Sequence, residues 1–129
     1  MDSEGIRDDV AQLISQHINS IEHLEVLLLL YRNPQKAWTA ADVSRELYTT
    51  PESAARWLAE LHASGLIVLD DTVQPCYHYA AGTNDTAVAN LAAAYKERRV
   101  RIINMIISKP LDHIRSFADA FKFKKEDDK

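Results

Sequence analysis

Apolar residues recur at helical spacing near the N-terminus, which predicts a helix over residues 5–18. Its apolar face consists of Ile6, Val10, Leu13, Ile14 and Ile18. The next segment, as far as about Arg32, is apolar almost all round and is therefore expected to form the buried centre of the domain. We expect Asn19 to cap this second helix, with Glu22 as the return acceptor. Asn33-Pro34 should end it, because proline cannot continue the hydrogen-bond ladder.

Two shorter helices follow. Thr39 is a capping residue with Asp42 at the return position, which predicts the start of a short helix. Thr50-Pro51 combines a capping hydroxyl with proline at the first helical position, where its missing N–H does no harm. We expect the helix that it begins to cover residues 51–64. Gly65 should end it, because glycine best tolerates a left-handed conformation just past a helix.

The rest of the chain predicts a hairpin and more helices. Residues 66–69 and 76–80 have the composition of two short strands, and the second carries the alternating Tyr-His-Tyr. Two strands are marginal alone, so they should pack on the helices. Residues 83–108 predict one long helix, which Lys109-Pro110 breaks. Residues 111–121 form a last amphipathic segment before a charged tail.

The C-terminal helices carry a broader apolar surface than one small domain usually covers, which predicts that a second copy packs there. We therefore expect a homodimer. The residues expected at its interface are Leu91, Tyr95, Ile102, Ile103, Ile106, Ile107, Ile114 and Phe117. The chain then has three parts: an N-terminal helix over residues 1–19, a central domain over 20–82, and C-terminal helices with the tail over 83–129.

The composition excludes several classes of protein. A chain of 129 residues with 47% hydrophobic content fits one domain with a real core. No apolar run approaches the roughly 18 residues that span a bilayer, so we expect no membrane segment. The single cysteine, Cys76, rules out an internal disulfide, and together with the acidic N-terminus it favours a cytoplasmic protein.

No group of residues has the types and spacing of a recognisable catalytic site, so we expect no enzymatic activity and no cofactor. Three glycines in total exclude a Gly-rich nucleotide loop in practice. Cys76 and His78 point to the same side of a predicted strand, but two ligands do not make a metal site, and the other histidines are scattered. We therefore expect no bound metal.

The formal charge of −4 is unevenly distributed. Residues 1–19 carry one arginine against four acids (−3), and residues 20–82 carry four basic residues against eight acids (−4). Residues 83–129 carry ten basic residues against seven acids (+3). Either the basic run at 96–101 is a solvated or phosphate-contacting face, or it pairs with the acids of the N-terminal helix of the same or a second chain. We favour the pairing, because the two terminal segments have opposite charges.

The order helix, short helix, turn, helix and hairpin is that of a winged helix. The stretch TPESAARWLAELHASGLI resembles the recognition-helix signature of bacterial winged-helix regulators, with Ala54, Leu58 and Leu61 facing inward. The stretch CYHYA resembles the returning strand of the wing. The whole order, with one extra helix before the domain and further helices after it, resembles the MarR type of regulator. This resemblance implies a mainly α fold with a small β-hairpin, DNA binding, and dimerisation through the terminal helices.

The resemblance places helix 51–64 in the major groove of double-stranded DNA. Arg56 has the chemistry to read guanine, and Ser53 to reach a base or a phosphate. Thr49, Thr50 and Arg45 are placed to contact the backbone. The alternative is purely structural. In that case Thr50 only caps the helix, and Arg56 only pairs with one of the neighbouring acids, Glu52 or Glu60.

A second alternative is a protein partner without DNA. The predicted wing offers Asp70, Asp71, Thr72, Val73 and Gln74, and no lysine or arginine occurs between Arg56 and Lys96. Fewer basic residues mean fewer released counterions and weaker DNA binding. The exposed side of helix 51–64 is rich in alanine. Trp57 should either pack across to Trp38 or the terminal helices, or act as an anchor for a partner.

Overall fold

A computed structural model of the chain describes residues 6–71 and 73–108. The elements in chain order are α1 (Asp8–His17), α2 (Ile21–Arg32), α3 (Ala40–Leu47), α4 (Pro51–Ala63), β1 (Ile67–Asp71), β2 (Pro75–Tyr79), α5 (Asp85–Glu97) and α6 (Arg99–Ile107). The mainly α fold with a small β-hairpin, predicted from the sequence, is thereby confirmed. The predicted segment 111–121 lies outside the described residues.

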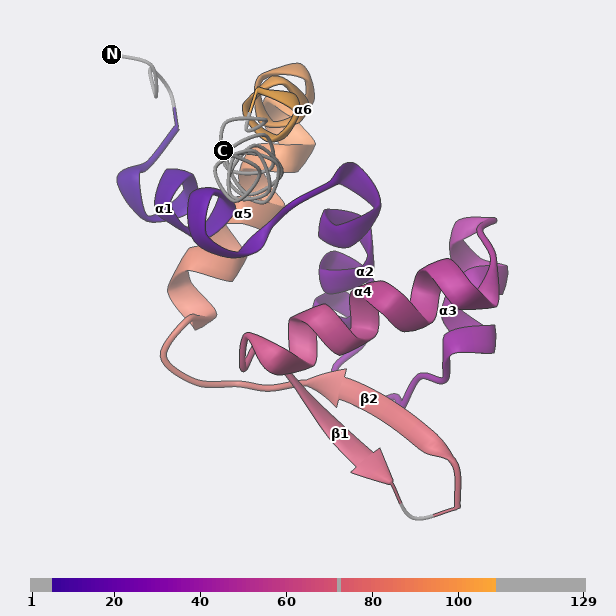
Figure 1. Cartoon of the computed structure of the whole chain (residues 1–129). Coiled ribbons are helices and arrows are strands. Elements are labelled where there is room, and N and C mark those ends of the chain that lie inside the picture. The colour runs from indigo at the N-terminus through magenta and orange to yellow at the C-terminus, as the bar shows by residue number, and fades with distance from the viewer. Residues whose placement is uncertain (1–5, 72, 109–129) are drawn as a thin grey trace, which may run out of the picture.

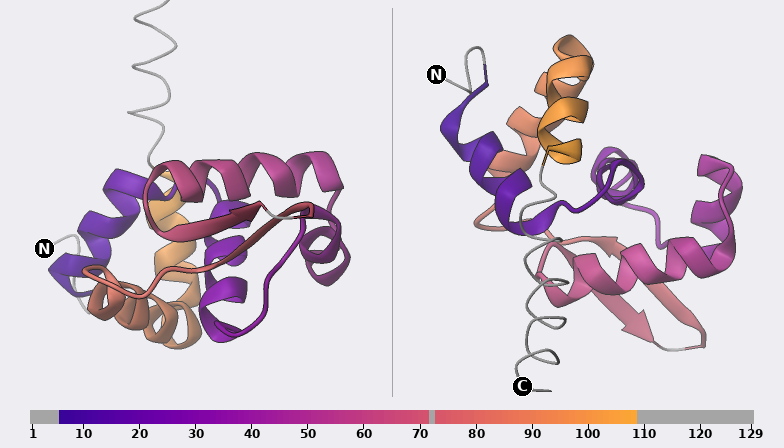
Figure 2. Two further views of the ribbon diagram at one scale, coloured as in Figure 1. Left: turned by 90° about the horizontal axis from the view of Figure 1, so that it is seen from below. Right: turned by 45° about the horizontal axis from the view of Figure 1, so that its top comes forward.

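α2 is the centre of the molecule. It contacts α3, α4, β2 and α5, and so joins two groups of elements. Figure 1 shows α3, α4 and the hairpin on one side of α2, and α1, α5 and α6 on the other. Within the second group α1 packs on both α5 and α6, which brings the two ends of the described chain together (Figure 2).

The core confirms the expected role of α2. Solvent reaches at most 1% of each of five aliphatic side chains on this helix: Leu24, Val26, Leu27, Leu28 and Leu30. Burying one such side chain contributes about 1.5–3 kcal/mol relative to leaving it in water. Buried residues from every other helix join the same cluster, including Ile14, Leu58 and Ile102. One continuous core therefore holds α4 and the terminal helices on opposite sides of α2.

The start of α2 corrects one expectation. Ser20, not Asn19, is the N-cap, and its hydroxyl accepts a hydrogen bond from the backbone N–H of His23 at 2.9 Å. The Asn19 backbone N–H donates instead to Nδ1 of His23 at 3.1 Å. Serine and asparagine are comparable caps, so adjacent candidates cannot be ranked by residue type. Glu22, expected to turn back onto this cap, accepts hydrogen bonds from the start of α4, as described below.

The predicted starts of α3 and α4 and the predicted end of α4 are confirmed. Thr39 Oγ1 accepts from the Asp42 backbone N–H at 3.0 Å, and the Asp42 carboxylate accepts from the Thr39 N–H at 3.2 Å. Thr50 caps α4 by accepting from the Ser53 N–H at 3.1 Å. Gly65 follows α4 with a φ of 82°, the left-handed conformation that glycine tolerates best. Local side-chain chemistry therefore sets where α3 and α4 begin and end.

The hairpin is fixed to the helices by a third stretch of chain. β1 and β2 pair antiparallel, with Ile67 opposite Tyr79. Just before α3, Trp38 bridges to Tyr77 of β2: the Trp38 N–H donates to the Tyr77 carbonyl at 2.7 Å, and the Tyr77 N–H returns a bond at 2.8 Å. This bridge gives β2 a partner on each side, which a lone two-stranded hairpin lacks.

The single long helix predicted over residues 83–108 is wrong. The chain breaks at Arg98, whose φ of −133° and ψ of 54° are not helical, into α5 and α6. No proline or glycine marks this position. The change of direction lets Ile102 and Ile106 bury against the body while α6 contacts both α1 and α5. Tertiary packing therefore overrides local helix propensity here.

Candidate nucleic-acid interface

The outward face of α4 is open to solvent, as the sequence predicts. Ala54, Leu58 and Leu61 are fully buried against α2 and the hairpin. The exposed residues of the helix are Pro51, Glu52, Ala55, Arg56, Ala59, Glu60, His62 and Ala63. Ser53 is half-buried at the first turn. This exposed face is small and smooth, and Arg56 is its only lysine or arginine.

Arg56 is exposed and contacts an aromatic ring. Its guanidinium carbon lies 4.6 Å from the centre of the Trp57 ring, a cation–π contact. Among the described residues no ion pair includes Arg56, so the proposed pairing with Glu52 or Glu60 is not found. A guanidinium held over a ring keeps its planar N–H groups available for a bidentate acceptor.

The Trp57 side chain belongs to the hydrophobic core. Only 8% of its surface is exposed, and its ring stacks on His23 of α2 with centroids 4.6 Å apart. The expectation of core packing is correct, although the stacking partner is neither Trp38 nor a terminal helix. The rival expectation of a protruding anchor fails, because a ring that is already buried has little surface left to bury.

The predicted contact hydroxyls at the start of α4 already have an acceptor. Thr49 Oγ1 donates to Oε2 of Glu22 at 2.9 Å, and Ser53 Oγ donates to the same oxygen at 2.8 Å. Glu22 comes from the first turn of α2 and is half-buried. Nothing in the local sequence indicated this contact, because an acid in a first turn is common for helix-capping reasons alone.

Arg45 is likewise held by an acid. It projects from the last turn of α3 and forms an ion pair with Asp42 at 2.6 Å. The pKa of Asp42 is lowered, mainly by the hydrogen bond from the Thr39 backbone N–H, with further contributions from Thr39 Oγ1 and nearby Lys36 and Arg45. Arg45 is exposed, so a phosphate approaching the turn has access to its remaining N–H groups.

Tyr48 is a feature of the turn that sequence reasoning missed. It ends α3 in the left-handed conformation, with a φ of 58°, and 95% of its surface is exposed. A bulky residue seldom adopts this conformation, which costs about 1–2 kcal/mol. The result is an aromatic ring projecting beside Thr49 and Thr50, at the same edge of the molecule as the start of α4.

The wing brings no positive charge. The described residues of the hairpin, 67–71 and 73–79, include no lysine or arginine. Asp70, Gln74 and Pro75 are exposed, and Val73 at the tip is 94% exposed. The wing therefore adds exposed apolar side chains, Val68 and Val73, beside α4, with no lysine or arginine to neutralise a phosphate.

Arg99, one member of the basic run on the terminal helices, pairs with an acid outside the N-terminal helix. Arg99 forms an ion pair with Glu25 of α2 at 3.6 Å and lies over the ring of Tyr95. Asp9 of α1 accepts from the Asn90 side chain of α5 at 2.9 Å. Glu25 also accepts from the Tyr95 hydroxyl, and burial followed by this bond raises the pKa of Tyr95. Within the described residues, Arg99 is thus tied to α2 rather than to the acids of α1.

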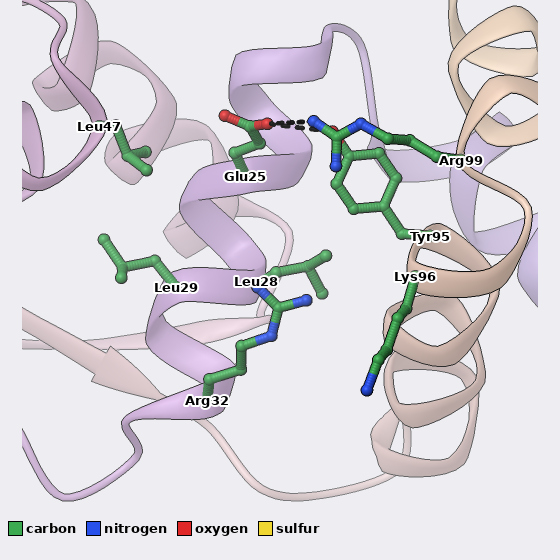
Figure 3. Close-up of a pocket in the computed structure, with 8 residues that line it drawn as sticks. All are labelled: Glu25, Leu28, Leu29, Arg32, Leu47, Tyr95, Lys96 and Arg99. Atoms are coloured by element: carbon green, nitrogen blue, oxygen red, sulfur yellow. Dashed lines mark hydrogen bonds and ion pairs between the residues drawn. The ribbon is translucent and has the colours of Figure 1, made fainter.

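A cavity of about 410 Å³ opens beside this ion pair (Figure 3). It lies between α2, the end of α3 and the α5–α6 break, and is lined by Glu25, Leu28, Leu29, Arg32, Leu47, Tyr95, Lys96 and Arg99. Leucines form one side, and Arg32, Lys96 and Arg99 outnumber the single acid. Such a lining suits a small molecule with an apolar body and an acidic group better than a cation.

The residues expected between two copies divide into three groups. Leu91, Tyr95, Ile102 and Ile106 are already buried within the single chain. Ile103 is half-buried, and Ile107 is 62% exposed. Ile114 and Phe117 lie outside the described residues. Of the expected interface residues that the structure describes, only Ile103 and Ile107 retain apolar surface for a second copy.

Other kinds of site are less well supported. Across residues 6–71 and 73–108, no group of three or more His, Cys, Asp or Glu side chains is arranged to hold a metal ion. In the same two segments no helix combines the length and the apolar character needed to cross a membrane. Cys76 is half-buried, and its Sγ lies 3.4 Å from the Gln74 carbonyl.

The arrangement of α2, α3, α4 and the hairpin defines the fold as a winged helix-turn-helix, in which α4 is the second helix of the helix-turn-helix. With α1 before this unit and α5 and α6 after it, the fold is of the MarR type. No family model and no curated protein matches the sequence.

Solved structures of one protein, MepR, are similar to the chain. The Staphylococcus aureus MepR–DNA complex superposes with a TM-score of 0.51 at 16% sequence identity, over 96% of this chain and 93% of that one. A S. aureus MepR mutant bound to an oligodeoxyribonucleotide gives a TM-score of 0.53 at 14% identity, over 89% and 88% of the two chains. Another MepR mutant, from a multidrug-resistant S. aureus clinical isolate, gives 0.50 at 16% identity, over 95% and 90%.

Proposed function

We propose that the chain is a DNA-binding protein of the transcription-regulator kind, which inserts α4 into the major groove. The observation that carries this proposal is the exposed face of α4, on which Arg56 forms no ion pair with any acid in residues 6–71 and 73–108. Arginine is the residue that most often reads guanine, through two parallel hydrogen bonds. Two of the similar solved structures are MepR bound to DNA.

The remaining contacts would come from the turn before α4. Arg45, Thr49, Thr50 and Ser53 all lie at its first turn or just before it, where a recognition helix meets the phosphate backbone. Such a binding role needs no catalytic group, and we propose a cytoplasmic regulator rather than an enzyme. With Arg45 and Arg56 as the main cations of this surface, binding should be weak and most evident at low salt.

The test is the retention of mixed-sequence duplex DNA by the wild-type chain and by Arg56→Ala over a series of salt concentrations. We expect wild-type affinity to fall as salt rises. Arg56→Ala should weaken retention, and if Arg56 contacts a phosphate, the salt slope should drop by about one.

Arg32→Ala is the matched control. It removes the same charge from the last turn of α2, outside the surface that we propose to contact DNA. This variant should leave retention close to that of the wild type. Absence of retention at the lowest salt, or equal losses in both variants, would contradict the proposal that α4 carries DNA binding.

A second candidate function is protein binding through the same face of α4. The observation that favours it is the acidic surrounding of the turn: Glu22 occupies the hydroxyls of Thr49 and Ser53, and the wing has no lysine or arginine. Exposed Ala55, Ala59 and Ala63 leave a smooth surface on which a partner helix could lie. Absence of DNA retention together with a well-folded chain would favour this candidate.

A further inference from the structure

Glu22 of α2 reaches the predicted DNA-contacting turn from another helix. Its Oε2 atom receives both hydroxyl hydrogen bonds, at 2.9 Å from Thr49 and 2.8 Å from Ser53. These residues lie 27 and 31 positions further along the chain, so the contact joins α2 to the start of α4. A carboxylate oxygen here takes the place that a phosphate oxygen would take in a complex with DNA, since both are anionic acceptors.

The contact is also accessible. Glu22, Thr49 and Ser53 are all half-buried rather than enclosed, and their neighbour Thr50 is exposed. Thr50 already caps α4, so Glu22 is not required to satisfy the Ser53 backbone N–H. An incoming phosphate could therefore compete for the two hydroxyls without unfolding the helix end.

We propose that Glu22 is a built-in competitor for the DNA backbone, which lowers the affinity of this turn for polyanions. This inference rests on the proposed function. In the free chain, Glu22 holds Thr49 and Ser53 in place. In a complex with DNA, the two hydroxyls exchange Glu22 for a phosphate, and the displaced carboxylate then lies close to that phosphate. The electrostatic repulsion between the carboxylate and the phosphate lowers the affinity for DNA. Glu22 thus sets the affinity for DNA without contacting a base.

The size of the effect follows from Coulomb's law. Two like unit charges about 4 Å apart in a water-like dielectric weaken an association by roughly fivefold. Closer approach, or partial burial of the pair, enlarges the effect. Glutamine in place of Glu22 keeps one oxygen acceptor for the hydroxyls and removes the charge.

The test compares the wild type, Glu22→Gln and Glu22→Asp for binding to a fluorescent pool of random-sequence duplexes at low salt. Glu22→Gln should bind about fivefold more tightly than the wild type. Glu22→Asp keeps the negative charge near the turn, so it should show no such gain. Thermal unfolding of all three variants shows whether any change in affinity reflects a change in fold.

Glu97→Gln is the control for charge alone, because Glu97 is exposed at the end of α5 and the substitution changes the net charge equally. A gain as large in Glu97→Gln, or in Glu22→Asp, would overturn the inference. So would unchanged or weaker binding by a folded Glu22→Gln chain.

The outcomes for the inference and for the proposed function can be told apart. If the wild type binds DNA and Glu22→Gln binds equally well, the competition is refuted and DNA binding stands. If neither the wild type nor Glu22→Gln binds at the lowest salt, the proposed function fails, and the inference fails with it. If only Glu22→Gln binds, both are supported.

Discussion

At the scale of single residues, two positions with left-handed backbone conformation lie on either side of α4. Tyr48 lies just before it with a φ of 58°, and Gly65 just after it with a φ of 82°. At Gly65 the residue type matches the conformation, whereas at Tyr48 it does not. Because Tyr48 is 95% exposed, no packing offsets its strain. Strain of this kind concentrates at functional sites, in keeping with a role for this turn in binding.

At Gly65, the effect of the left-handed backbone conformation on stability can be measured without a steric clash. A Cβ built at Gly65 meets no atom within 4 Å, so alanine would cost only the left-handed conformation. We expect Gly65→Ala to lower the free energy of unfolding by about 1 kcal/mol. Gly82→Ala is the matched control, because its Cβ also meets nothing and its φ lies outside the left-handed region. Urea denaturation of both variants checks this, and equal effects would contradict it.

At the scale of elements, the two helices of the helix-turn-helix depend on their caps. The Thr39–Asp42 pair satisfies two of the backbone N–H groups at the start of α3, and Thr50 satisfies one at the start of α4. Asp42 has a second effect, because it also holds Arg45. The same carboxylate thus stabilises a helix and restrains a cation that the proposed function requires.

The capping role of Asp42 predicts a pH dependence. Its pKa is lowered in the folded chain, mainly through the Thr39 N–H bond. The stabilisation is therefore complete above the unfolded pKa of 3.8 and is lost as pH falls through the lower folded value. Asp42→Ala should cost about 1 kcal/mol near neutral pH, and the difference from wild type should shrink in acid. Chemical denaturation at several pH values measures this.

Glu46→Ala provides the comparison for Asp42→Ala. Glu46 lies on the same helix and is exposed, and it does not take part in the Thr39 cap. Its replacement should change stability by no more than about 0.5 kcal/mol at any pH. A pH-independent loss in Asp42→Ala would show that the charge of Asp42 is not the cause.

At the scale of the whole molecule, the terminal helices complete a core and still leave apolar surface. Ile107 is 62% exposed and Val100 70% exposed, both on α6. The breadth of this surface was the reason to expect a homodimer, and we keep that proposal for Ile107 and the half-buried Ile103. A dimer would present two copies of α4, as a pseudo-palindromic DNA site requires.

Light scattering of the purified chain tests this proposal. We expect a dimer that Ile107→Asp shifts toward monomer, because a charge at a packed apolar contact carries a desolvation cost of several kcal/mol. Val73→Asp is the control: Val73 is even more exposed, but it lies at the tip of the wing. A monomeric wild type, or equal dissociation in both variants, would contradict the proposed interface.

The sequence predicted features that depend on neighbouring residues and missed those that depend on distant ones. Thr39, Thr50, Pro51 and Gly65 act within one turn of helix, so their types alone located α3 and α4. The hydrogen bonds of Glu22 cross 27 positions or more, and no periodicity specifies which acid reaches which hydroxyl.

Packing also decided two points that the apolar pattern left open. Four of the apolar residues expected at a dimer interface are buried, but their pattern could not show whether they face the chain's own core or a second copy. It also could not show the break at Arg98, because the packing of α6 on α1 depends on the finished fold. Trp57 is similar: its burial was expected, and its stacking on His23 was not.

The paired backbone bonds between Trp38 and Tyr77 have a mechanical consequence. They connect the wing to the residues just before α3, so that the position of the wing relative to the helix-turn-helix does not depend on β1 alone. If α4 binds DNA as we propose, a wing held in this way favours DNA that already fits its shape or bends at low cost, and the deformability of the DNA then contributes to selectivity.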